Sequence, residues 1–182
     1  HSSNDTLNLD NIFDEIKKER KTLKGDYLKL LLSYQTLCES ITYTKGSMEV
    51  LDRIGLQYRY DGKYDSAEVY HKKSLQLALE LNDSTQLYYN YNNLGQVYRM
   101  QDLSVQAIYY FHKALKISDA LGILKASSYT MNTLGAAYVV QKEYDQAMYY
   151  FKASASIAKK REDKRTLAYN YGSMGEVLLL QG

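Results

Sequence analysis

Apolar side chains recur every three or four positions through most of this chain, which is the spacing that lines one face of an α-helix. Short polar interruptions divide the pattern, among them Asp61-Gly62, Asn82-Asp83 and Gly122. Asp83, followed three residues later by Gln86, is typical of a capping box that begins a helix. The pattern predicts an all-α protein. The predicted helices are 47–60, 64–81, 84–100, 103–121, 124–140, 144–161 and 164–181.

Residues 7–41 carry helical spacing in a different arrangement. Apolar positions from Leu9 to Leu23 predict one helix, and the segment from Tyr27 to Ile41 predicts another. Gly25-Asp26 lies between them as a helix stop and an N-cap. We interpret 7–41 as an atypical helix pair at the end of a repeat array, where the core needs covering on one side only.

The remaining helices repeat with a period of 40 residues, seen as columns of identical or similar residues. A glycine follows an apolar residue, a tyrosine comes three residues later, an alanine twelve residues after the glycine, and an aromatic residue four after that. These columns are Gly55, Gly95, Gly135 and Gly175; Tyr58, Tyr98 and Tyr138; Ala67, Ala107 and Ala147; and His71, Phe111 and Phe151. We expect each glycine to face the alanine, so that two antiparallel helices approach closely while the aromatic rings fill the space beside them.

These columns resemble the signature of the tetratricopeptide repeat, in which an L-G-x2-Y segment precedes A-x3-F. The first aromatic of that signature is replaced, its closing proline is missing, and the period exceeds the usual value of about 34. The tract from Asn92 to Tyr98 is similar to long-period variants in kinesin light chains and bacterial regulators. The resemblance covers residues 47–182 and implies a right-handed superhelical solenoid of antiparallel helix pairs.

The repeat predicts one array over residues 1–182. After the atypical pair come repeats at 47–82, 83–122 and 123–162, and the first helix of an incomplete fourth repeat at 163–182. A last helix that exposes Val177, Leu178 and Leu180 would cap the array poorly. We therefore expect either a longer protein or a covering partner, including self-association through this helix.

In the family that the chain resembles, the first helix of each pair lines a groove that holds peptides. Carried over by position, the resemblance implies a groove of Tyr89, Asn92, Gln96, Arg99, Tyr129, Asn132 and Tyr169. Tyrosine offers a large amphipathic contact area, and asparagine can both donate and accept hydrogen bonds. The alternative is that these tyrosines only pack between repeats. Glu49 and Asp52 lie at the corresponding positions of the first repeat, and their charge disfavours a partner's C-terminal carboxylate.

A second set of tyrosines follows the second helices. Its members are Tyr70, Tyr110 and Tyr150, with Val69, Tyr109 and Tyr149 beside them. We expect these residues to pack between repeats, and a binding face on the second helices is the alternative. His71 stands in a phenylalanine column and is expected to be a partly buried packing residue.

The composition of the chain argues against several classes of function. A net charge of +2 gives no reason to expect nucleic-acid binding, and the longest apolar run, Val177 to Leu180, is far too short to span a membrane. The absence of proline permits long helices, and Cys38 lies in an apolar pattern as a packed thiol. No motif for catalysis, phosphate binding or metal ligation is present, so we expect no enzyme, cofactor or metal.

The leading hypothesis is a non-catalytic scaffold that binds an unidentified protein or peptide. The alternative is a sensor or regulatory domain of a larger bacterial signalling protein or transcriptional regulator. An enzyme built on such repeats, such as a response-regulator phosphatase, would need a larger helical bundle than 7–41 can supply. Location stays open between a bacterial cytoplasm and, if His1 follows a removed export signal, a periplasm.

Overall fold

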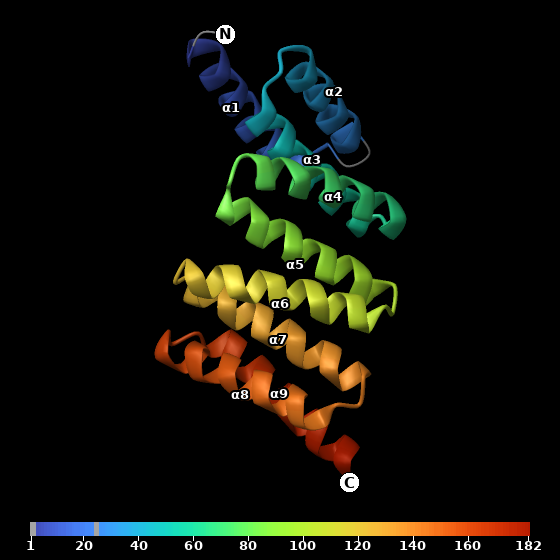
Figure 1. Cartoon of the computed structure of the whole chain (residues 1–182), viewed down its shortest axis with the longest axis vertical. Coiled ribbons are helices and arrows are strands. Elements are labelled where there is room, and N and C mark those ends of the chain that lie inside the picture. The colour runs from blue at the N-terminus through green and yellow to red at the C-terminus, as the bar shows by residue number, and fades with distance from the viewer. Residues whose placement is uncertain (1–2, 24–25) are drawn as a thin grey trace. The chain divides into compact units, whose positions relative to one another are not determined.

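The computed structural model describes residues 3–23 and 26–182, and within these ranges every regular element is helical (Figure 1). The predicted all-α architecture of sequential helix pairs is confirmed. The elements are α1 (Ser3–Lys18), η1 (Glu19–Lys21), α2 (Tyr27–Ser40), α3 (Thr44–Tyr60), α4 (Tyr64–Glu80), α5 (Ser84–Met100), α6 (Ser104–Ala120), α7 (Leu124–Val140), α8 (Tyr144–Lys160) and α9 (Lys164–Gln181). Of the predicted separator, Gly25 lies outside the described residues, and Asp26 is the N-cap of α2 without a side-chain capping bond.

The helices from α3 to α8 are all 17 residues long. Connections of three residues join them, so each helix begins 20 residues after the previous one and a pair occupies 40. Helix α3 begins at Thr44, three residues before its predicted start. The prediction began late because Thr44, Lys45 and Gly46 are not part of the apolar pattern. The other predicted ends from 64 onward lie within one residue of the observed ones.

Each connection closes its helix in the same way. Its middle residue adopts a left-handed conformation, with φ of 72° at Gly62 and 60° at Lys142. The N–H of the next residue then donates to a carbonyl five residues back, as from Lys63 to Tyr58 at 2.9 Å and from Glu143 to Tyr138 at 3.0 Å. This is the Schellman arrangement, which satisfies the last carbonyls of a helix.

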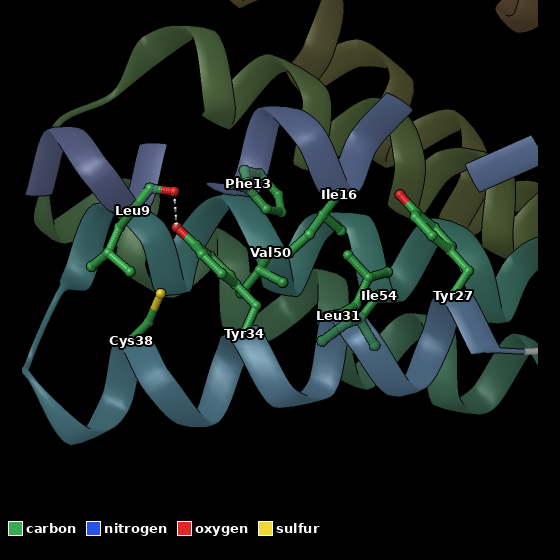
Figure 2. Close-up of a cluster of buried hydrophobic side chains, with 9 residues drawn as sticks. All are labelled: Leu9, Phe13, Ile16, Tyr27, Leu31, Tyr34, Cys38, Val50 and Ile54. Carbon is green, nitrogen blue, oxygen red and sulfur yellow. Dashed lines mark hydrogen bonds between the residues drawn. The ribbon is translucent and has the colours of Figure 1, made fainter. Parts of the chain in front are cut away.

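The chain divides into two compact units, residues 1–86 and 87–182. In the first unit, the predicted N-terminal pair packs with α3 around one apolar core (Figure 2). Phe13 of α1 stacks on Tyr34 of α2 with ring centroids 5.0 Å apart, and the Tyr34 hydroxyl donates to the Leu9 carbonyl at 3.1 Å. Cys38 is fully buried in this core, and burial raises the pKa of its thiol, as expected of a packed residue.

In the second unit, the repeat glycines Gly95 and Gly135 lie against aromatic rings. A Cβ placed on Gly95 would come within 2.5 Å of the Phe111 ring, and one on Gly135 within 2.6 Å of Phe151. The expectation that the glycine faces the alanine is corrected, because the ring four residues further along α6 or α8 is the nearest neighbour. No atom lies within 4 Å of a Cβ built on Gly175.

The motif tyrosines stack on the second tyrosine set inside the same repeat. The Tyr98 and Tyr110 ring centroids are 5.3 Å apart, and those of Tyr138 and Tyr150 are 5.5 Å apart with nearly parallel planes. The expected packing between repeats is confirmed for Tyr150, whose ring also lies edge-on to His112 of the preceding repeat at a centroid distance of 5.8 Å. The aromatic contacts of Tyr110 are with Tyr91, Tyr98 and Tyr109 of its own repeat.

Candidate functional site

In the first unit, Asp52 belongs to the core and not to a binding surface. Its carboxylate oxygen lies 3.0 Å from Nδ1 of His71, and His71 is fully buried. The expected groove position of Asp52 and the partial burial expected of His71 are therefore both corrected. The physical reason is that the carboxylate gives the imidazole a hydrogen-bonding partner, which allows a polar ring to occupy the phenylalanine column.

The second unit contains a cavity of about 770 Å³ formed by α5, α7 and α9 together with the connection before α9. Five of the seven residues that the sequence singled out line it. These are Gln96, Arg99, Tyr129, Asn132 and Tyr169. Both tyrosine rings keep substantial exposure, 49% for Tyr129 and 63% for Tyr169, so they offer aromatic surface to a ligand.

Two predicted groove residues lie elsewhere. Asn92 is buried, and Tyr89 is half exposed with its ring set edge-on to Tyr88 at a centroid distance of 5.2 Å. Neither lines the cavity. Of the predicted groove residues on α5, the cavity thus includes only Gln96 and Arg99 near its C-terminal end, together with the predicted residues of α7 and α9.

Hydrogen bonds hold the polar wall of the cavity in place. Nε2 of Gln96 donates to the Tyr129 hydroxyl at 3.2 Å, and Nε of Arg99 donates to Oε1 of Gln96 at 3.1 Å. On the other side, Nδ2 of Asn132 donates to Oδ1 of Asn170 at 2.8 Å. These bonds connect α5 to α7 and α7 to α9, so the polar groups are oriented before any ligand arrives.

The charged groups around the cavity are mostly cationic. Arg99, Lys125, Arg161 and Arg165 line it, against a single lining carboxylate, Asp163. That carboxylate caps α9, accepting from the Thr166 backbone N–H at 3.0 Å and from its hydroxyl at 2.8 Å. These hydrogen bonds lower the pKa of Asp163, and the charges of Arg161 and Lys125 lower it further. The capped carboxylate stays ionised, and the cavity keeps an excess of positive charge.

Lys125, Arg161 and Arg165 are absent from the groove that the sequence predicted. A signal for two of them was present, because Lys125 and Arg165 are separated by one repeat period of 40 residues. Arg161 is the C-cap residue of α8, a position where helical spacing does not say which way a side chain points.

Among the residues that the structure describes, no cluster of three or more His, Cys, Asp or Glu side chains could bind a metal ion. Within the same part of the chain, no helix has the length and apolar character needed to cross a membrane.

Comparison with known proteins places these features in context. Two family models, each described as tetratricopeptide repeat, match residues 47–120 and 128–161. No curated protein sequence matches the chain.

Several solved structures share the fold. BtubC (BKLC) from P. vanneervenii superposes with a TM-score of 0.86 at 16% identity, over 96% of this chain and 74% of that one. A signal transduction ATPase with numerous domains (STAND) from Pyrococcus horikoshii, which has a tetratricopeptide repeat sensor, superposes with a TM-score of 0.82 at 21% identity, over 92% of this chain and 26% of that one. TPR-like repeats of a candidate kinesin light chain from Podosopora anserina superpose with a TM-score of 0.80 at 10% identity, over 96% of this chain and 87% of that one. At these identities the likeness establishes the fold alone.

Proposed function

The chain belongs to the tetratricopeptide-repeat family, whose arrays generally act as protein-interaction scaffolds, and we propose that it binds a partner peptide in the cavity of its second unit. The observation that carries this proposal is the lining of that cavity by two exposed tyrosine rings and a set of preoriented polar groups. Tyr129 and Tyr169 supply the aromatic area, and Gln96 and Asn132 supply hydrogen-bonding groups. No catalytic role is proposed.

The dimensions of the cavity suit a short extended segment. Its lining along α7 runs from Lys125 to Ala136, eleven residues further on, which at the helical rise corresponds to about 16 Å. An extended chain covers this distance in about five residues. The volume falls in the range of about 300–1,000 Å³ that is usual for ligand sites.

A pair of matched double variants tests the proposal. Replacing Tyr129 and Tyr169 with alanine removes the aromatic lining, whereas replacing Tyr109 and Tyr149 removes two equally exposed rings from α6 and α8. We expect the first variant to lose at least tenfold in affinity for peptides selected from a random displayed library, because buried aromatic anchors dominate such interfaces. We expect the second to bind as the parent protein does.

Circular dichroism and thermal unfolding of both variants serve as the folding control. The proposal fails if the α6 and α8 variant loses binding while the cavity variant keeps it, since that result would place the interface on the second helices. It fails equally if the library yields no peptide that binds the parent protein.

A second candidate function is that of a sensor domain, favoured by the likeness to the tetratricopeptide repeat sensor of the STAND protein. In that case a bound peptide should change the separation of the two units. Fluorescence energy transfer between one label in residues 44–80 and another in residues 104–160 would measure this separation. An unchanged transfer efficiency on peptide binding would rule out the sensor function and leave only the scaffold function.

A further inference from the structure

Three of the four lining cations gather at one end of the cavity. Lys125 is the second residue of α7, Arg165 is the second residue of α9, and Arg161 is the C-cap residue that follows α8. Asp163 lies beside two of them: its pKa is lowered first by the Thr166 hydrogen bonds and further by the charges of Arg161 and Lys125. Glu162, in the same connection, is exposed and lies outside the lining. A ligand at this end therefore meets three cations against one lining carboxylate, which leaves an excess of positive charge.

The placement of Lys125 and Arg165 is unfavourable for the helices that carry them. The N-terminus of a helix bears a partial positive charge, so acidic residues stabilise its first turn and basic residues do not. Neither α7 nor α9 has an acidic residue in its first turn. Helix α8, in the same unit, has Asp145 there, as helix stability favours. Residues that oppose local stability concentrate at functional positions, and an anion bound at this end would be stabilised by these cations.

The fourth cation lies toward the other end of the cavity. Arg99 is in the last turn of α5 and is hydrogen-bonded to Gln96, which in turn reaches Tyr129. Along α7, Tyr129 and Asn132 follow Lys125, and along α9 Tyr169 follows Arg165, and all of these residues line the cavity. A single phosphate would occupy only one end, whereas a peptide with carboxylates spread along about five residues would meet cations at both ends and aromatic rings between them.

We infer that the segment bound by this cavity is an acidic peptide, with its carboxylates concentrated toward Lys125, Arg161 and Arg165. This inference rests on the proposed peptide binding and names the chemistry of the partner.

The probes are three pools of fluorescent peptides of about eight residues, acetylated and amidated to remove terminal charge. All pools are randomised over Ala, Asn, Leu and Tyr, and each carries fixed positions of Glu, Gln or Lys. We expect the full chain to bind the Glu pool at least tenfold more tightly than the Gln pool, and to bind it more weakly as salt is raised from about 50 to 500 mM, where screening shortens the reach of each charge. The Lys pool should bind weakest.

The variant Lys125→Glu with Arg165→Glu should remove the preference for the Glu pool and gain affinity for the Lys pool. Its melting temperature should not fall, because both new acids lie at helix N-termini. The matched control, Lys116→Glu with Lys152→Glu, makes the same change of charge on α6 and α8 outside the cavity and should keep the parent preference. If the first variant does melt lower, Lys125→Gln with Arg165→Gln replaces it, with loss of the preference as the expected result.

Four results would overturn the inference. Equal binding of the three pools would leave the proposed function standing and remove its acidic specificity. An equal loss in the control variant would assign the preference to the overall charge of the protein. Tighter binding of a single-stranded oligonucleotide of matched charge would indicate a nucleic-acid surface. Failure of every pool to bind would remove the proposed function as well.

Discussion

Asp52 and His71 form a buried pair that the later repeats replace with asparagine and phenylalanine. The equivalent pairs are Asn92 with Phe111 and Asn132 with Phe151. We predict that His71→Phe destabilises by about 1–3 kcal/mol, because it leaves the Asp52 carboxylate without this buried partner, and that Asp52→Asn destabilises by about 1 kcal/mol, because the amide keeps an acceptor oxygen but loses the charge that strengthens the bond. The double variant, which copies the later repeats, should recover about 1 kcal/mol or more of the summed loss. Urea unfolding of the four proteins gives this coupling free energy.

The control for that cycle is Asp52→Asn combined with Phe111→Tyr, a substitution in the other unit. Its effects should add, since the two positions lie in different compact units. Strict additivity of Asp52→Asn and His71→Phe themselves would contradict the prediction.

At the scale of single residues, the sequence predicted part of the cavity lining. Tyr129, Asn132 and Tyr169 were found because they recur with the motif columns and the family resemblance assigns them a face. Lys125 and Arg165 recur with the same period but lie at helix starts, outside the columns beside the motif glycine where a groove was sought. The contact of Asp52 with His71 depends on the register of two packed helices, which spacing within one helix does not determine.

The helical elements owe their length to the connections that end them. Glycine takes the left-handed position at Gly62 and Gly122, whereas Thr42 and Lys142 hold the same conformation with φ of 54° and 60°. A side chain there costs roughly 1–2 kcal/mol. We predict that Gly62→Ala and Gly122→Ala destabilise by about 1 kcal/mol, and that Thr42→Gly and Lys142→Gly stabilise by up to about 1 kcal/mol after the larger entropy of the unfolded glycine chain is subtracted. Differential scanning calorimetry measures both series.

Gly175→Ala is the matched control for these glycine substitutions. It lies within α9, where an added Cβ meets no atom within 4 Å, so alanine there should stabilise by about 0.5–1 kcal/mol through helix propensity. If Gly62→Ala stabilised to the same extent, the left-handed conformation would carry no cost, and the account of helix termination given above would be wrong.

The ends of the helices were predicted best where helix-breaking residues recur with the 40-residue period. The Asn82-Asp83 boundary is an example, since the Asp83 carboxylate accepts from the Gln86 N–H at 2.9 Å as the capping pattern predicted. The return bond of a full capping box would need the Asp83 N–H, which instead donates to the Ala78 carbonyl at 3.0 Å, while Nε2 of Gln86 donates to the Ser74 hydroxyl at 3.5 Å. That choice depends on tertiary neighbours, which no local pattern contains.

At the scale of the whole molecule, the net charge did not predict the cluster of cations that lines the cavity. A net charge of +2 gave no reason to expect an anion site, yet four cations and one capped carboxylate line the same cavity. Charge at this scale reports solubility and long-range steering, whereas recognition depends on which side chains the repeat brings to one face.

The 20 tyrosines of the chain predict an alkaline limit to its stability. Burial raises the pKa of a subset above the value of about 10 that an unfolded chain shows. This subset is Tyr27, Tyr34, Tyr43, Tyr70, Tyr88, Tyr138 and Tyr150. A raised folded-state pKa means that the unfolded chain loses these protons first. The stability they contribute is therefore complete below about pH 10 and is lost as pH rises from there through the folded-state pKa values.

We expect the melting temperature to fall steeply above about pH 10, together with a cooperative rise in phenolate absorbance as the chain unfolds. Tyr138→Phe with Tyr150→Phe removes two partly buried phenols of raised pKa, which form one stacked pair, and should flatten this fall. Tyr109→Phe with Tyr149→Phe, which removes two exposed phenols, should leave it unchanged. Lysines also lose charge in this range, but they do so equally in all three proteins, so a difference between the two variants isolates the buried phenols. Identical pH profiles for both variants would mean that lysine deprotonation, and not the burial of tyrosine, sets the alkaline limit.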